Sequence, residues 1–143
     1  MTDVLQELFS IKGRTALVTG GTSGIGRMIA EGYVRAGATV FVASRKADAV
    51  AATVAELSPL GAIEGTPANL STEEGCRALA GWVAERTASL DILVNNAGAT
   101  WGAPAAEHPV EAWDKVMNLN VRGYFLLSQA IAKASMIPRK QGR

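Results

Sequence analysis

Short runs of aliphatic residues alternate with longer segments of helical periodicity along the 143-residue chain. This alternation is typical of a parallel sheet whose strands are joined by crossover helices. Strands are predicted at Thr15–Thr19, Thr39–Ala43, around Ala62–Pro67 and at Leu90–Asn95. Right-handed crossovers place four such strands in the order 3-2-1-4. The expected fold class is therefore α/β, with a doubly wound parallel sheet.

Two helices are predicted between the first three strands. Apolar residues recur on one helical face over Ile25–Ala36, and Gly37 follows as a C-terminal cap. The apolar positions of Val50–Leu57 indicate a second helix, which Pro59 and Gly61 would end.

Two more helices are predicted in the second half of the chain. Ser71 and Glu74 have the spacing of a capping box at the start of one of them. Pro109 suits the first position of a long helix over Val110–Met136, and Pro138–Arg143 is predicted to be a turn.

Length and composition predict one compact domain and exclude several classes of protein. Apolar residues make up 48% of the chain and charged residues 19%, unlike a disordered chain. A net charge of +1 does not suit a general binder of nucleic acid or of an anionic membrane. With Cys76 and His108 as the only thiol and imidazole, no metal site is expected. The single thiol and the lack of a membrane-length apolar segment favour a cytoplasmic location.

A glycine-rich segment, Gly20–Gly26, lies between the first predicted strand and its helix. Glycines let the backbone approach a pyrophosphate, and the helix N-terminus supplies N–H donors. The strand order reverses between strands 1 and 4, so Asn95–Gly98 would flank the same crevice. A nucleoside-triphosphatase loop needs Lys-Ser/Thr where Arg27-Met28 stands. These features favour a Rossmann-type dinucleotide site over the alternative, a glycine turn that only packs helix on strand.

The residues after the second predicted strand bear on the choice of dinucleotide. An acidic residue there binds the ribose 2′-hydroxyl of NAD, whereas a basic one accommodates the 2′-phosphate of NADP. This chain has Ser44, Arg45 and Lys46, and its next carboxylate is Asp48. The pattern favours NADP(H), the alternative being a solvated helix start.

Three motifs together resemble the short-chain dehydrogenase/reductase family. They are Thr19-Gly20-x-x-x-Gly24-x-Gly26, Asn95-Asn96-Ala97-Gly98 and the region of Asn120. The resemblance extends from about Lys12 to Arg143. It is strongest to reductases of the 3-oxoacyl-carrier-protein type, including the rhamnolipid-associated kind, whose Asn-Ala-Gly-x-x-Trp-Gly stretch is similar to Asn96–Gly102.

The resemblance implies a set of NADP(H)-binding residues. The pyrophosphate and the adjacent ribose would lie on Gly20, Thr22, Ser23, Gly24, Ile25 and Gly26. The 2′-phosphate would be held by Ser44 and Arg45, and the adenine by Asn69 and Leu70. The far ribose would contact Asn96, Ala97 and Gly98. At position 69 the family more often has Asp, and Asn keeps an acceptor there.

Asn120 matches the helix asparagine that, in this family, helps to hold a water molecule of the proton relay. Asn118 is the competing candidate, because residues two apart on a helix are separated by ~200°. An apolar pair before Asn120 and Gly123-Tyr124 after it favour Asn120. For either asparagine, the alternative is a satisfied polar residue in a helix core.

The family's hydride transfer also uses a Ser, a Tyr as acid/base and a Lys four residues after that Tyr. These 143 residues contain no Tyr-x-x-x-Lys, since Tyr33 precedes Gly37 and Tyr124 precedes Ser128 at that spacing. Gly142-Arg143 resembles the approach to a fifth strand. We therefore expect a single incomplete domain, truncated before that strand and inactive by itself.

The resemblance implies the cofactor-binding portion of an NADPH-dependent oxidoreductase whose substrate is a small carbonyl or alcohol of the 3-oxoacyl type. The alternative is a non-catalytic dinucleotide-binding or interaction module. The long helix is apolar on more than one face, as at Val121 and Phe125, and in the family it lies in a subunit interface. A homo-oligomer formed through this helix is expected, with Leu90–Asn95 as an unpaired sheet edge.

Overall fold

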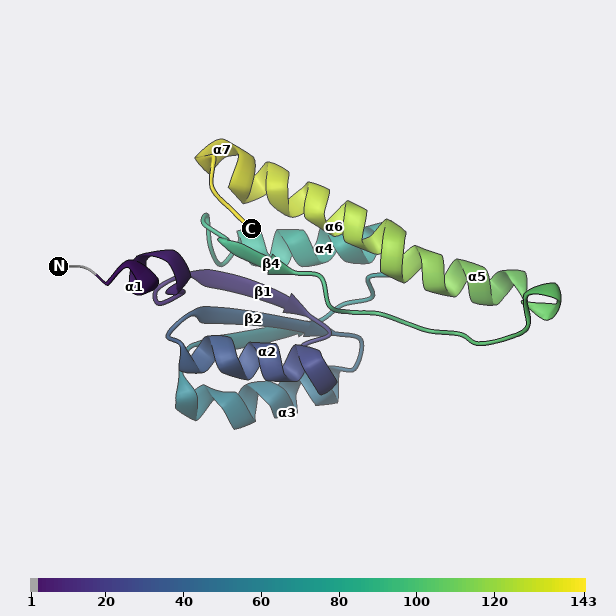
Figure 1. Ribbon diagram of the computed structural model, residues 1–143, viewed down its shortest axis with the longest axis horizontal. Coiled ribbons are helices and arrows are strands. Elements are labelled where there is room, and N and C mark those ends of the chain that lie inside the picture. Colours follow the sequence, from purple (N-terminus) through teal and green to yellow (C-terminus); the bar gives the residue numbers. More distant parts are fainter. Residues whose placement is uncertain (1–2) are drawn as a thin grey trace.

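A computed structural model, which describes residues 3–143, contains a four-stranded parallel sheet (Figure 1). The strands are β1 (Thr15–Thr19), β2 (Thr39–Ser44), β3 (Ile63–Pro67) and β4 (Ile92–Val94). Their order is β3-β2-β1-β4, and every pair is parallel. The predicted fold class and strand order are confirmed.

Helices cover both faces of the sheet (Figure 1). On one face lie α2 (Gly24–Arg35) and α3 (Ala47–Leu57), and on the other lie α4 (Glu73–Ala84) and a long C-terminal helix. A short helix that the sequence analysis did not predict, α1 (Val4–Phe9), precedes the sheet, with Asp3 as its N-cap. None of the helices within residues 3–143 combines the length and the apolar character needed to cross a membrane.

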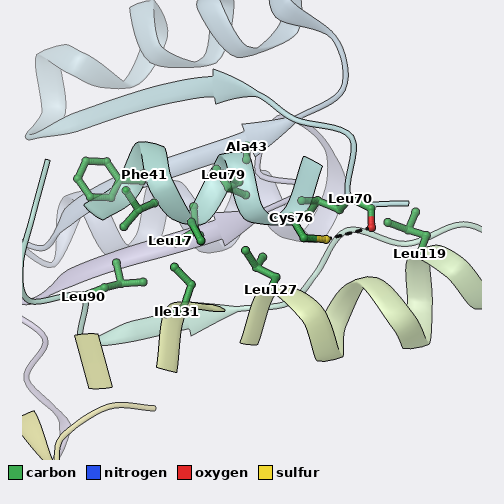
Figure 2. Close-up of a cluster of buried hydrophobic side chains, with 12 residues drawn as sticks. Leu17, Phe41, Ala43, Leu70, Cys76, Leu79, Leu90, Leu119, Leu127 and Ile131 are labelled. Carbon is green, nitrogen blue, oxygen red and sulfur yellow. Dashed lines mark hydrogen bonds between the residues drawn. The ribbon is translucent and has the colours of Figure 1, made fainter. Parts of the chain in front are cut away.

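The two faces of the sheet carry separate hydrophobic clusters. Val18, Val34 and Leu57 belong to the cluster under α2 and α3. Leu17 and Leu127 belong to the cluster under α4 and the long helix, which is drawn in Figure 2. Because both faces are covered, the central strand β1 is a continuous apolar run and does not alternate with polar residues.

The register brings the carboxyl ends of three strands together. Thr19 at the end of β1 pairs with Ala43 of β2, and Val18 pairs with Val94 of β4. The chain leaves β1 for α2 and leaves β4 for the loop after Asn95, so the two connections diverge at this edge. A crevice at such a point is where open α/β sheets bind ligands.

The long helix is more complex than predicted. It consists of α5 (Val110–Met117), a π-helical segment at Asn118–Gly123, α6 (Tyr124–Ile131), a second π segment at Ala132–Met136, and α7 (Ile137–Arg139). The structure thus has the predicted long helix, with two π segments that were not predicted, and a π turn takes in an extra residue.

The helix begins at Val110, as predicted, but the extended ψ of 142° at Pro109 makes that residue the N-cap and not the first helical residue. At the other end, Pro138 lies within α7, in the last turn of the long helix. The helix ends at Lys140, whose φ of 52° is left-handed. The predicted turn therefore begins later than Pro138.

Two other predicted boundaries are corrected. The N-cap of α4 is Thr72, whose Oγ1 accepts the N–H of Gly75 at 3.1 Å, so Ser71 does not cap this helix. The backbone N–H of Ser71 instead donates to Asn69 Oδ1. Strand β4 is shorter than Leu90–Asn95, because the N–H of Asn96 bonds to a side chain of β1.

The outer edge of β4 is not bare, contrary to the expectation. Arg143 accepts the N–H of Leu93 at 2.8 Å and donates its own N–H to the carbonyl of Asp91 at 2.9 Å. The Asp91 carboxylate accepts the N–H of Thr15 and a 2.7 Å hydrogen bond from Arg139. Burial raises the pKa of Asp91, but the Arg139 and Thr15 hydrogen bonds and nearby positive charge outweigh that effect and lower it.

Candidate functional site

The hydroxyl of Thr19 joins the carboxyl ends of β1 and β4. Thr19 is fully buried, and its Oγ1 donates to the carbonyl of Val94 at 3.1 Å. The same oxygen accepts the N–H of Asn96 at 3.0 Å and that of Ala97 at 3.1 Å. Three backbone groups of the β4 connection are therefore held by one side chain of β1.

The side chain of Asn96, after β4, in turn forms hydrogen bonds to the end of β1. Its Nδ2 donates to the carbonyls of Thr19 at 3.0 Å and Gly20 at 3.3 Å. On the other side, the N–H of Gly20 donates to the carbonyl of Ala43 at 2.8 Å. The first residue of the glycine-rich loop is thus fixed between the ends of β2 and β4.

Glycine is required at several positions of this loop. Gly20 and Gly24 have left-handed φ values of 64° and 52°. A Cβ added to Gly20 would lie 2.8 Å from Asn96 Nδ2. A Cβ added to Gly26 would overlap both Gly20 O and Asn96 Nδ2. The first turn of α2 therefore packs directly on the strand ends.

The N-terminus of α2 offers an anion site at the same place. Ser23 is its N-cap, and the side chain of Ser23 makes no capping hydrogen bond. The first N–H groups of a helix have no partner within it, and the helix dipole favours negative charge there. The first turn of α2 contains no acidic residue that would oppose such an anion.

Arg27, the cation that directly follows this loop in the sequence, is engaged elsewhere. Its guanidinium pairs with Glu31 at 3.2 Å and with Glu56 at 2.9 Å. A hydrogen bond from Arg35, assisted by the charge of Arg27, lowers the pKa of Glu31 against the opposing effect of desolvation. Arg27 is therefore part of a surface network that links α2 to α3.

Arg45, by contrast, is exposed at the end of β2, and no ion pair involves it among residues 3–143. Ser44, the last residue of β2, is half-buried beside it. Asp48 accepts the N–H of Ala49 within the first turn of α3. The end of β2 therefore presents a hydroxyl and an uncompensated guanidinium.

A cavity of about 260 Å³ lies at the crevice. Eight predicted site residues line it: Gly20, Ser23, Ser44, Arg45, Leu70, Asn96, Ala97 and Gly98. Ala43, Ala68 and Leu119 line it as well and were not predicted. Ala43 and Ala68 could have been found as small residues at strand ends, whereas nothing in the sequence separates Leu119 from other core leucines.

The other predicted residues do not line this cavity. Gly26 packs beneath the loop, Thr22 and Gly24 belong to the loop itself, and Ile25 is 66% exposed. The side chain of Asn69 accepts the N–H of Ser71 at 3.1 Å, so one of the two lone pairs of its Oδ1 is already in use. Within residues 3–143, no three acidic, His or Cys side chains are grouped as metal ligands.

Asn120 contacts the loop that continues from the crevice. Its Oδ1 accepts the N–H of Ala99 at 2.9 Å, and its Nδ2 donates to the carbonyl of Ala99 at 2.8 Å. Of the two candidate asparagines, it is Asn120 that makes these side-chain bonds from the π segment. Asn95 braces the same helix through a 3.0 Å bond from its Nδ2 to Ser128 Oγ.

Comparison with known proteins links this geometry to one family. The family model described as short chain dehydrogenase matches residues 14–143. A rhamnolipids biosynthesis 3-oxoacyl-[acyl-carrier-protein] reductase of Pseudomonas aeruginosa is 52% identical over 123 residues, which cover 86% of this chain and 48% of that protein. A 2-dehydro-3-deoxy-D-gluconate 5-dehydrogenase of Pseudoalteromonas atlantica is 39% identical over 139 residues, or 96% of this chain and 54% of that protein.

Solved structures agree with these matches. An NADP active-site complex of RhlG from Pseudomonas aeruginosa superposes with a TM-score of 0.83 at 50% identity, covering 87% of this chain and 49% of that one. A metagenomic short-chain oxidoreductase in complex with NADP gives a TM-score of 0.87 at 34% identity, covering 94% and 61%. The chain spans about half the length of the curated relatives it matches.

Thr19→Val tests the contact between the strand ends. Valine keeps the shape of the side chain but removes the hydroxyl contacts to the carbonyl of Val94 and to the N–H groups of Asn96 and Ala97. The Asn96 N–H and the Val94 carbonyl keep their own 3.1 Å bond, so the N–H of Ala97 loses most. We expect a loss of about 1–3 kcal/mol in the free energy of unfolding, measured by chemical denaturation. Thr100→Val, at an exposed loop position, is the control and should change stability little. Equal stabilities for the two variants would contradict the role given to Thr19.

Proposed function

Because this chain belongs to the short-chain dehydrogenase family, we propose that it forms a single incomplete domain, the NADP(H)-binding portion of an oxidoreductase. The observation that carries the proposal is the cavity at the strand ends, bordered by Ser44 and by the guanidinium of Arg45, which takes part in no ion pair within residues 3–143. The NADP complexes of the similar structures support the same cofactor.

Each part of the cofactor has a candidate partner on the cavity wall. The N–H groups at the start of α2, with Gly20 and Ser23, would bind the pyrophosphate. Ser44 and Arg45 would hold the 2′-phosphate, because a guanidinium binds a phosphate in a bidentate manner. The remaining lining residues divide between the two ends: Leu70 on the adenine side, and Asn96, Ala97 and Gly98 on the nicotinamide-ribose side. Asn69 precedes Leu70 outside the lining, and its amide would contact the edge of the adenine.

The cofactor would supply hydride chemistry, and the chain would position it. Asn120 would hold the loop at Ala99 in place through both ends of its amide, next to the nicotinamide-ribose wall. The acid/base Tyr and its Lys have no counterpart in these 143 residues. Carbonyl reduction would therefore need residues from outside them.

We propose a small carbonyl of the 3-oxoacyl type as the substrate of the complete enzyme. The support is the 52% identity to the Pseudomonas 3-oxoacyl reductase over 123 residues. A cytoplasmic location would suit such an enzyme, and the buried, unpaired Cys76 is compatible with a reducing compartment.

Arg45→Ala tests the choice of cofactor. The variant loses the guanidinium beside the 2′-phosphate, so its affinity for NADP(H) should fall roughly 10- to 100-fold, while its affinity for NAD(H) should change little. Titration calorimetry with both dinucleotides measures this. Lys133→Ala, which removes an exposed cation from the long helix, is the control. Equal affinities for the two cofactors, unaffected by Arg45→Ala, would contradict the assignment.

Turnover by the 143-residue chain tests the missing acid/base step. With NADPH and a 3-oxoacyl thioester, we expect no measurable oxidation of the cofactor, because general acid–base catalysis contributes ~10²–10⁴-fold. The assay follows NADPH absorbance. Robust oxidation that Asn120→Ala abolishes would show that these residues contain a catalytic set that we have not identified.

We also propose that the chain associates with a second copy of itself through the long helix. Val121, Phe125 and Ile137 on this helix are 53%, 63% and 65% exposed. Large exposed apolar patches are unusual on monomers and commonly mark interfaces.

Phe125→Lys tests this interface. The charge should oppose association and lower the mass-average molecular weight measured by light scattering over a concentration series. Met28→Lys, at a 65% exposed position on α2, should leave association unchanged. A wild-type chain that stays monomeric at high micromolar concentration would contradict the proposal.

A further inference from the structure

The segment between β3 and α4 is held by two successive backbone carbonyls. The hydroxyl of Thr72 donates to the carbonyl of Asn69 at 3.3 Å. The thiol of Cys76 faces the carbonyl of Leu70, with 3.5 Å between Sγ and the oxygen (Figure 2). Both donors come from the start of α4, and neither lines the nucleotide cavity.

The Cys76 thiol is suited to donate. Burial is the main effect on its pKa and raises it, so the sulfur stays protonated at neutral pH. Its second neighbour is the carbonyl of Gly123 in the first π segment, 3.7 Å from Sγ. One buried thiol therefore lies between the β3–α4 connection and the long helix.

A glycine faces each of the two carbonyls. A Cβ added to Gly75 would overlap the carbonyl of Asn69, and a Cβ added to Gly123 would overlap that of Leu70. Backbone oxygen atoms cannot move aside as the end of a flexible side chain can. Both glycines lie in helical segments, where alanine is intrinsically favoured. Glycine at these two positions therefore allows the close approach to the carbonyls, although it lowers the helix propensity.

The contact between Gly123 and the carbonyl of Leu70 bears on the width of the nucleotide cavity. Leu70 and Leu119 both line it, one from the β3–α4 connection and the other from the π segment that contains Gly123. Figure 2 draws both leucines near the Cys76–Leu70 hydrogen bond, whose acceptor is the carbonyl of Leu70. The backbone contact at Gly123 therefore determines how far the Leu70 wall of the cavity lies from the Leu119 wall.

We propose that Gly75, Gly123, Thr72 and Cys76 form a carbonyl clamp that positions Leu70 as the adenine wall of the dinucleotide site. The four are positioning residues, since the cavity lining does not include them. The inference rests on the proposed function, because it assigns the Leu70 side of the cavity to adenine. The new element is that affinity for the adenosine half of the dinucleotide depends on these four residues, which contact Leu70 or the chain next to it from outside the cavity.

Gly123→Ala is the principal test. The probe is adenosine 2′,5′-bisphosphate, which contains the adenine and the 2′-phosphate without the nicotinamide, and its binding is measured by calorimetry. The added Cβ must push the Leu70 carbonyl away, and we expect the dissociation constant to rise at least about fivefold. The fitted stoichiometry reports the folded fraction, so a purely structural loss would lower that number and leave the constant unchanged.

Gly81→Ala and Gly32→Ala are matched controls. Both glycines lie in α-helices, and a Cβ at either would meet no atom within 4 Å. These variants should bind the probe as the wild type does. At the thiol, Cys76→Ala should weaken binding because it removes the donor, whereas Cys76→Ser keeps a donor and should recover most of the affinity.

Amide hydrogen exchange without nucleotide tests the clamp independently. Exchange over residues 68–72 should become faster in Gly123→Ala and stay at the wild-type rate in Gly81→Ala. The clamp would be overturned if exchange over residues 68–72 were the same in Gly123→Ala as in the wild type. It would also be overturned if the wild type bound the probe and Gly123→Ala bound it with the same dissociation constant. If the wild type bound neither the probe nor NADP(H), the proposed function would be contradicted. If exchange were still faster in Gly123→Ala than in the wild type, the clamp would remain as a structural contact only.

Discussion

The buried hydroxyl of Thr19 is the contact on which the crevice depends. It satisfies three backbone groups of the β4 connection, and Asn96 returns two hydrogen bonds to the end of β1. Backbone groups buried where strands end have no ladder partners, so a side chain must supply them. With these bonds in place, Gly26 packs against Gly20 O, and Ser23, the N-cap of α2, lines the cavity.

Two arginines near this edge of the sheet, Arg27 and Arg45, differ in the charged residues around them. Arg27 is neutralised by Glu31 and Glu56 and serves the packing of α2 on α3. Arg45 stands outside every ion pair found among residues 3–143 and borders the cavity. A nucleotide phosphate would therefore meet a guanidinium whose charge is not already balanced, and the proposed selectivity for a 2′-phosphate rests on that contrast.

Sequence reasoning succeeded where one local pattern dominates. The aliphatic run Thr15–Thr19 and the glycines after it predict a strand, a tight turn and a helix, and the structure has all three. It failed at the start of α4, where two neighbouring hydroxyl residues both suit an N-cap, and the structure has Thr72 in that role while the N–H of Ser71 bonds to Asn69. It also failed where contacts join residues distant in sequence. Asn120 bonds to Ala99, and Gly123 packs on the carbonyl of Leu70, so no local pattern could reveal these contacts.

The parallel topology also orders the assembly of the crevice in time. Contacts among β1, β2, α2 and β3 join residues close in sequence, whereas the bond between Thr19 and Asn96 closes a loop of 77 residues. Loop closure costs entropy before the contact repays it, which makes distant parallel pairing slow. The α2–α3 half of the sheet can therefore form first, and β4 docks onto a prepared β1. The ligand crevice is then among the last features of the chain to appear during folding.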